Sequence, residues 1–116
     1  DYATTGDGLL AGAMLVDLVR REAQPLATLA RNAMTSLPQT LINIRVTQVV
    51  KSPAEDLAAE IADATKRLDG IGRVLLRASG TEPVVRVMVE AASQETADAV
   101  AQGLAEVVSQ RFGGVR

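Results

Sequence analysis

The feature that most constrains the fold is a β-branched apolar residue at every second position in two separate stretches. Ile42, Ile44 and Val46 alternate with Asn43, Arg45 and Thr47, and further along Val85, Val87 and Val89 alternate around Arg86. Successive side chains of a β-strand point to opposite faces of a sheet, so each stretch predicts a strand with one buried face. The run from Arg73 to Ala78 predicts a third strand, joined to the next one (Val84 to Glu90) by a short turn.

Helices are predicted between and after these strands. Ser52-Pro53-Ala54-Glu55 has the form of a capping box with proline at the first helical position, and predicts a helix that ends at Asp69-Gly70. Its apolar stripe consists of Leu57, Ile61, Ala64 and Leu68. A last helix starts at the N-cap Ser93, buries Ala97, Val100, Ala101, Leu104, Val107 and Val108, and stops at Phe112-Gly113-Gly114. This order predicts an α+β domain of two layers, an antiparallel sheet covered by two helices.

The first third of the chain is predicted to be helical. A helix follows the turn at residues 4–8 with Asp7 as its N-cap, and a second runs from Pro25 to about Ala33. The segment Thr35-Ser36-Leu37-Pro38 breaks the helical pattern, so we place a domain boundary there, with residues 1–36 before it and 37–116 after it. The start at Asp1, without an initiator methionine, suggests a piece excised from a longer chain.

Composition excludes several classes of function. The chain has no cysteine and no histidine, which removes disulfide frameworks, thiolate zinc sites and histidine-dependent catalysis, and fits a cytoplasmic protein. A net charge of -2 provides no general attraction to nucleic acid. The sequence has neither a signal peptide nor an apolar run of the ~18 residues or more that a membrane span needs.

The segment from Arg77 to Pro83 is the main candidate site. Arg77 offers a planar fork for phosphate oxygens, Ser79 and Thr81 offer hydroxyls, and Gly80 lets backbone approach an anion closely. Arg86, on the following strand, offers a second guanidinium. Serine, glycine, threonine and proline are also ordinary turn residues, and a plain hairpin turn is the more frequent origin of such a segment.

The carboxylates give weaker signals. Glu82 lies beside the candidate loop and is suited to a sugar hydroxyl or an arginine, whereas Glu55 is explained by its place in the capping box. Asp56, Glu60 and Asp63 share one helix face that we expect to be solvated, and no acidic cluster has the spacing of a metal site. The turn at residues 4–8 could receive an anion at a helix start, but Asp7 would repel it.

The stretch Arg77-Ala78-Ser79-Gly80-Thr81-Glu82-Pro83-Val84-Val85-Arg86-Val87 resembles the phosphate-binding loop and following strand of the α-D-phosphohexomutases. The segment from Asp1 to Leu9 resembles the end of the family's third domain, and Leu37 to Ile44 resembles the first strand of its fourth. The family's loop usually has proline where this chain has Ala78. Because proline has no N–H to donate, this difference costs rigidity and not a contact.

The resemblance implies an enzyme of four domains that moves a phosphoryl group between two positions of a hexosamine phosphate, through a phosphoserine and a bisphosphorylated sugar. It assigns the substrate's non-reacting phosphate to Arg77, Ser79, Gly80, Thr81 and Arg86 of this chain. It places the phosphoserine and the aspartates that hold Mg²⁺ in upstream domains of the same chain, so the fragment alone is predicted to be inactive. It leaves the oligomeric state open.

Two alternatives remain. The sugar could be mannose or glucose, because a loop that grips only phosphate does not read the sugar. The chain could also be a stand-alone module that binds protein or nucleic acid on its open sheet face. That face has Arg45, Arg77 and Arg86, but the aromatics Tyr2 and Phe112 lie outside the strands.

Overall fold

The structure is a computed structural model that describes residues 6–115. The predictions that rest on residues 1–5, including the turn before Asp7 and the place of Tyr2, lie outside the described residues. The chain divides into two compact units, Asp1–Ser36 and Leu37–Arg116, and each is described by itself.

The first unit contains two helices, α1 (Gly8–Glu22) and α2 (Leu26–Ala33). Asp7 caps α1 as predicted: its carboxylate accepts hydrogen bonds from the backbone N–H groups of Leu9 and Leu10 at 3.0 and 2.9 Å. Pro25 precedes α2 at its N-cap position, so this helix begins one residue later than predicted. Neither helix buries a residue within the described structure, and the side chain of Leu9 is 87% exposed. These helices therefore present apolar side chains that no described part of this chain covers.

The second unit is built on an antiparallel sheet of strand order β2-β3-β1-β4. The three predicted strands are present as β1 (Gln39–Val46), β2 (Gly72–Ala78) and β3 (Val84–Ala91). The sequence did not predict β4 (Gly114–Val115), which pairs with the last two residues of β1. Because β4 is so short, only its pairing with a distant strand identifies it as part of the sheet.

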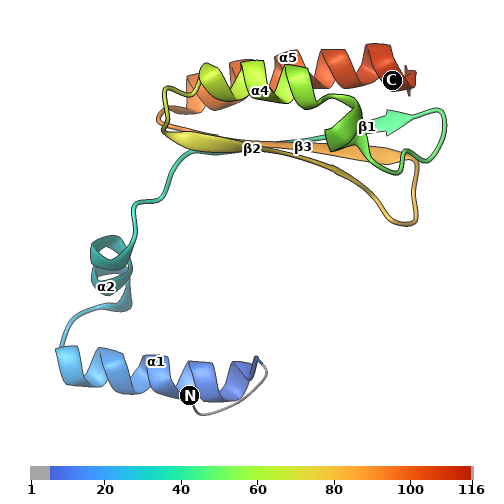
Figure 1. Cartoon of the computed structure of the whole chain (residues 1–116). Helices are drawn as coiled ribbons and strands as arrows, with labels where there is room; N and C mark the ends of the chain where they lie inside the picture. The colour runs from blue at the N-terminus through green and yellow to red at the C-terminus, as the bar shows by residue number, and fades with distance from the viewer. Residues whose placement is uncertain (1–5, 116) are drawn as a thin grey trace. The chain divides into compact units, whose positions relative to one another are not determined.

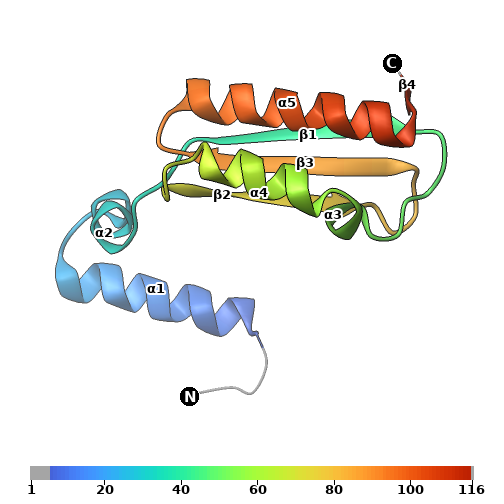
Figure 2. The ribbon, with the colours of Figure 1, turned by 45° about the horizontal axis from the view of Figure 1, so that its top comes forward.

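One face of the sheet is covered by helices and the other is open. Helices α4 (Ala58–Lys66) and α5 (Gln94–Phe112) lie together on one face, and in this unit no described helix lies on the opposite face (Figures 1 and 2). The core between the layers is aliphatic. Its fully buried side chains include Val85, Val87 and Val89 of β3 and Ala97, Val100 and Val108 of α5. This is the predicted two-layer α+β fold.

The helix predicted to begin at Ser52 is broken in two, and this prediction was wrong in detail. A four-residue helix, α3 (Pro53–Asp56), ends at Leu57, and α4 begins after it. Ser52 occupies the N-cap position, but its side chain makes no capping hydrogen bond. Leu57 is only 1% exposed, so the break falls at the residue of this segment that packs most deeply against the core. Tertiary burial thus overrides a helix signal that is strong in the local sequence.

Helix α5 is fixed to the start of β1 by a polar cluster. The Ser93 hydroxyl caps α5 by accepting from the N–H of Thr96, as predicted. One turn further, Thr40 Oγ1 donates to Asp98 Oδ1, and the Gln94 amide donates to the same carboxylate at 2.9 Å. These two hydrogen bonds lower the pKa of Asp98 below its ordinary value because they stabilise the carboxylate. The cluster ties the first residues of the unit to its longest helix.

Candidate functional site

The strand register arranges the side chains of the open face in rows that run across the sheet. Alternation places the odd-numbered residues of β1 and β2 and the even-numbered residues of β3 on this face, since their neighbours are the buried valines and isoleucines. Four rows result, each read from β2 to β3 to β1. From the loop end they are Ser79–Val84–Arg45, Arg77–Arg86–Asn43, Leu75–Met88–Leu41 and Arg73–Glu90–Gln39.

The second row brings two predicted site residues together. Arg77 and Arg86 are directly paired across β2 and β3, and both side chains are exposed on the open face. In this structure neither forms an ion pair within residues 6–115; the described pairs are Asp17–Arg21, Asp63–Lys66 and Arg73–Glu90. Like charges directly opposite each other destabilise a sheet by roughly 0.2–1 kcal/mol. Two facing arginines without a carboxylate therefore form a place where an anion would be stabilised.

The other predicted residues lie on the loop that follows Arg77. The Ser79 N–H donates to the Val84 carbonyl at 2.8 Å, which extends the pairing of β2 and β3 by one residue. The N–H groups of Gly80 and Thr81 have no backbone acceptor within the described part of the chain. In Figure 1 this loop bends away from α4 and α5, toward the open face. The loop that carries these N–H groups thus bends toward the side of the sheet where the arginines lie.

Gly80 is not required by the fold. A Cβ atom added there would meet no atom within 4 Å, and its φ lies outside the range that side chains avoid. At the other end of β2, Gly72 has φ +115°, and a Cβ there would lie 2.0 Å from the Glu90 carbonyl oxygen. The protein needs glycine at position 72 for packing. At position 80 it gains only open space above the loop.

At the end of the open face far from the loop, the charged side chains form an ion pair. Arg73 donates two hydrogen bonds to the Glu90 carboxylate, at 2.8 and 3.1 Å, and this ion pair raises the pKa of Arg73. An apolar row formed by Leu75, Met88 and Leu41 separates this pair from Arg77 and Arg86. On the described open face, positive charge without a partner is therefore confined to the loop end.

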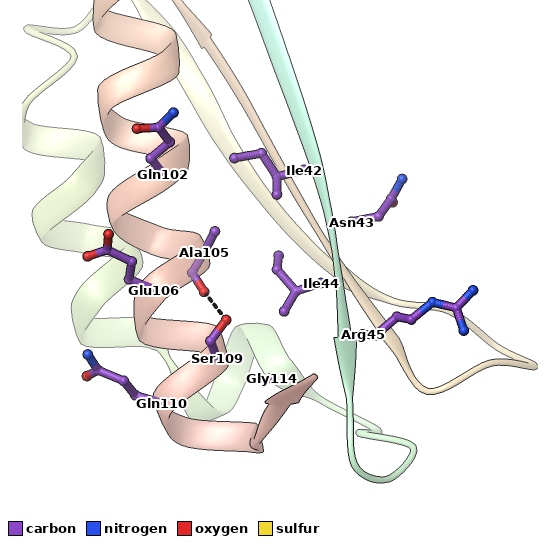
Figure 3. Close-up of a pocket in the computed structure, with 10 residues that line it drawn as sticks. All are labelled: Ile42, Asn43, Ile44, Arg45, Gln102, Ala105, Glu106, Ser109, Gln110 and Gly114. Atoms are coloured by element: carbon purple, nitrogen blue, oxygen red, sulfur yellow. Dashed lines mark hydrogen bonds between the residues drawn. The ribbon is translucent and has the colours of Figure 1, made fainter. Parts of the chain in front are cut away.

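Another hollow of the second unit is lined by neither Arg77 nor Arg86. A groove of about 760 Å³ runs between β1 and α5, with Ile42 and Ile44 on its floor and Gln102, Glu106 and Gln110 along the helix (Figure 3). It contains no cluster of reactive side chains among the described residues. A smaller hollow of about 340 Å³ adjoins Arg77 at the outer edge of β2, where Lys51 and Ser52 line it. Because the paired Arg77 and Arg86 lie outside the groove, the candidate site is placed on the open face.

Residues 6–115 contain neither a cluster suited to a metal ion nor a helix suited to a membrane span. Within residues 6–115, no group of three or more histidine, cysteine, aspartate or glutamate side chains is arranged to hold a metal ion. Over the same range, no helix combines the length and apolar character that a membrane crossing requires. The acidic residues Asp56, Glu60 and Asp63 are exposed, as the sequence indicated.

Comparison with known proteins defines the class to which this fold and loop belong. Residues 41–107 match the C-terminal domain of the phosphoglucomutase/phosphomannomutase family. The chain belongs to this family, and the match covers β2, β3, the loop between them and most of β1.

Curated relatives narrow the comparison further. The chain is 53% identical over 109 residues to a phosphoglucosamine mutase of Thermobifida fusca, and 50% identical over 113 residues to one of Kocuria rhizophila. These alignments cover 93% and 97% of this chain but only 24% and 25% of the relatives. The chain thus spans about a quarter of the length of the curated relatives it matches.

Solved structures agree with this assignment. An Aspergillus fumigatus N-acetylphosphoglucosamine mutase, solved in complex with GlcNAc-6P and magnesium, has a TM-score of 0.57 and 35% identity over 67% of this chain and 16% of that chain. A serine-to-alanine variant of the same fungal enzyme, in complex with glucose 1,6-bisphosphate, has a TM-score of 0.68 and 25% identity over 92% of this chain and 21% of that chain. The fold predicted by the resemblance is confirmed.

The structure brings two further polar residues next to the predicted site residues. Asn43 lies directly opposite Arg86, and Arg45 lies directly opposite Val84. The alternation in β1 already placed both on the open face. However, which residues of β3 they face depends on the strand register, which the sequence did not provide.

Proposed function

We propose that this chain is the C-terminal portion of a phosphoglucosamine mutase, the isomerase that interconverts glucosamine 6-phosphate and glucosamine 1-phosphate. Its own task is to grip the phosphate that is not reacting. The observation that carries this proposal is the unpaired Arg77–Arg86 pair beside a loop with free N–H groups, within the described residues. The identity to phosphoglucosamine mutases over nearly the whole chain supports the choice of enzyme.

The chemistry of the loop end suits a phosphate dianion. Arg77 and Arg86 supply two positive charges, which balance a phosphate group of charge close to -2 at neutral pH. The N–H groups of Gly80 and Thr81 and the hydroxyls of Ser79 and Thr81 supply hydrogen-bond donors to its oxygens. None of these groups selects for the rest of the ligand. Such a grip suits an enzyme that binds either phosphate of one sugar in turn.

The remaining steps require groups that the described residues do not provide. We propose that the phosphoserine and the ligands of Mg²⁺ belong to upstream domains, and that this chain alone has no mutase activity. The related fungal enzyme was solved with magnesium, whereas residues 6–115 of this chain have no arrangement that fits the ion. We propose that the parent enzyme is cytoplasmic, because the absence of cysteine from this chain is compatible with a reducing compartment.

The first unit is proposed to be the end of the family's third domain. Its helices α1 and α2 bury none of their residues within the described chain, and Leu9, Val16 and Met34 are each at least 68% exposed. Exposed apolar side chains of this number are typical of helices whose packing partner is another part of the protein. We propose that this partner is the preceding part of the third domain.

A phosphomannomutase or phosphoglucomutase is the second candidate, because the matching family is described by those two activities. The phosphate grip proposed here would serve any of the three sugars. Rates of the full-length parent on glucosamine, mannose and glucose phosphates decide between them. A preference for mannose or glucose phosphate would overturn the first choice and leave the phosphate grip intact.

The phosphate grip is tested by titrating the ¹⁵N-labelled chain with glucosamine 6-phosphate and following amide shifts by NMR. The shifts of Gly80 and Thr81 should move, and Arg77→Gln should weaken binding by about tenfold or more, since hydrogen bonds to charged groups contribute ~1.5–3 kcal/mol. Arg73→Gln is the matched control, because it removes the same charge from the satisfied end of the same strand. Equal effects of the two substitutions would contradict the proposal.

A further inference from the structure

Arg45 occupies a position on the open face that the family resemblance does not assign to the phosphate. It lies near the end of β1, and its side chain is exposed. Figure 3 shows Asn43 and Arg45 projecting from β1 on the side away from α5, whereas Ile42 and Ile44 point toward α5. Arg45 therefore faces the same side of the sheet as Arg77 and Arg86.

The register places Arg45 at the border of the candidate site. It pairs with Val84 of β3. On the β2 side, the Val84 carbonyl accepts a hydrogen bond from the N–H of Ser79 in the loop. Arg86 is the next open-face residue along β3 and is thus the diagonal neighbour of Arg45; such neighbours are separated by roughly 7–8 Å or somewhat less between their Cβ atoms. Ser79, Arg77, Arg86 and Arg45 consequently surround the half-buried Val84. A ligand lying over Val84 would be within reach of guanidinium groups from three strands.

The charges around Val84 are not balanced by the protein. In the described chain, Arg45, Arg77 and Arg86 form no ion pair, and Glu82 on the loop is the nearest carboxylate in sequence. Three neighbouring cations repel one another, which the fold tolerates only because they are solvated. An anion over Val84 would interact favourably with all three at once.

We propose that Arg45 is a third guanidinium of the phosphate site, closing it on the β1 side opposite Ser79. This inference rests on the proposed function, because it extends the same site by one residue. Asn43, opposite Arg86, contributes an amide but no charge. Lys51 is a further cation close to Arg77: it lines the hollow at the outer edge of β2, whereas Arg45 lies on β1, on the other side of β3.

The experiment measures the affinity of the 116-residue chain for inorganic phosphate and for glucosamine 6-phosphate, using the amide shifts of Gly80 and Thr81. Three substitutions that each remove one positive charge are compared: Arg45→Gln, Arg77→Gln and Arg73→Gln. Arg45→Gln should raise the dissociation constant of both ligands by about fivefold, which corresponds to the ~1 kcal/mol of a solvent-exposed ion pair. Arg45→Lys, which keeps the charge but loses the fork, should restore only part of the affinity.

The control and the outcomes separate this inference from the proposed function. Arg73 lies four residues from Arg77 along β2, roughly 13 Å, which exceeds the ~8–10 Å Debye length, so Arg73→Gln should change affinity by less than about twofold. If Arg77→Gln weakens binding while Arg45→Gln matches Arg73→Gln, the third guanidinium is refuted and the phosphate grip stands. If the unsubstituted chain shows no shift at Gly80 or Thr81, both proposals are refuted. A single cooperative melting transition, close in temperature to that of the unsubstituted chain, establishes that each variant remains folded.

Discussion

Replacing Gly80 and Gly72 separately by alanine should distinguish a glycine that serves a ligand from one that serves the fold. Gly72 is the first residue of β2 and Gly80 lies on the loop after it, and the substitution is the same at both positions. At position 80 the added methyl group meets no atom within 4 Å. The free energy of unfolding should therefore change by no more than about 0.5–1 kcal/mol, and in the stabilising direction, because alanine restricts the unfolded chain.

At position 72 the same methyl group cannot be accommodated. The Cβ would lie 2.0 Å from the Glu90 carbonyl oxygen, and the backbone has φ +115°. A side chain in such a conformation costs about 1–3 kcal/mol, and the displacement of β3 adds to it. We expect Gly72→Ala to destabilise the chain by about 3 kcal/mol or more, in the tail of single-residue effects.

Phosphate binding should be weakened by Gly80→Ala, the substitution that leaves stability nearly unchanged. A methyl group on Gly80 occupies the space through which the loop N–H groups approach an anion, so one charge-assisted hydrogen bond of ~1.5–3 kcal/mol should be lost. Urea denaturation measures stability, and the NMR titration with glucosamine 6-phosphate measures affinity. A Gly80→Ala variant that binds as tightly as the unsubstituted chain would refute the role of this loop. A Gly72→Ala variant of unchanged stability would refute the account of the β2–β3 contact.

Two further predictions concern charge. Arg86→Gln removes the like-charge pair with Arg77, so it should stabilise the ligand-free chain by roughly 0.2–1 kcal/mol in urea denaturation. The same substitution should weaken phosphate binding in the NMR titration. A loss of stability would mean that Arg86 serves the fold. Thr40→Val should raise the pKa of Asp98 toward its ordinary value in an NMR pH titration, because one of the two hydrogen bonds to its carboxylate is removed. Because the folded-state pKa of Asp98 is lowered, its contribution to stability is complete above the unfolded value of ~3.9 and is lost as pH falls through the folded value. Thr40→Val should reduce that acid-side loss, and an unaltered pKa would exclude the Thr40 hydrogen bond as its cause.

The sequence predicted the helices and strands whose signals come from residues close together in the chain. Apolar residues at every second position identified β1 and β3, and the run from Arg73 to Ala78 identified β2. Capping residues identified the starts of α1 and α5. These features depend on neighbouring residues. The break at Leu57 and the strand β4 escaped prediction. The break falls at a residue buried by the tertiary core, and β4 is defined by pairing with a strand far away in the sequence.

In the candidate site, too, some features follow from local sequence and others only from the tertiary structure. The sequence by itself determined the loop from Arg77 to Pro83, the presence of Arg86 on the open face, and the resemblance that gives them a meaning. Only the tertiary structure decided which side chains of β1 and β3 face each other, because these strands are far apart in the sequence and no local turn fixes their register. A shift of β1 by one residue would turn Arg45 to the buried face. The observed register instead places it beside Val84, where it borders the same surface as Arg77 and Arg86.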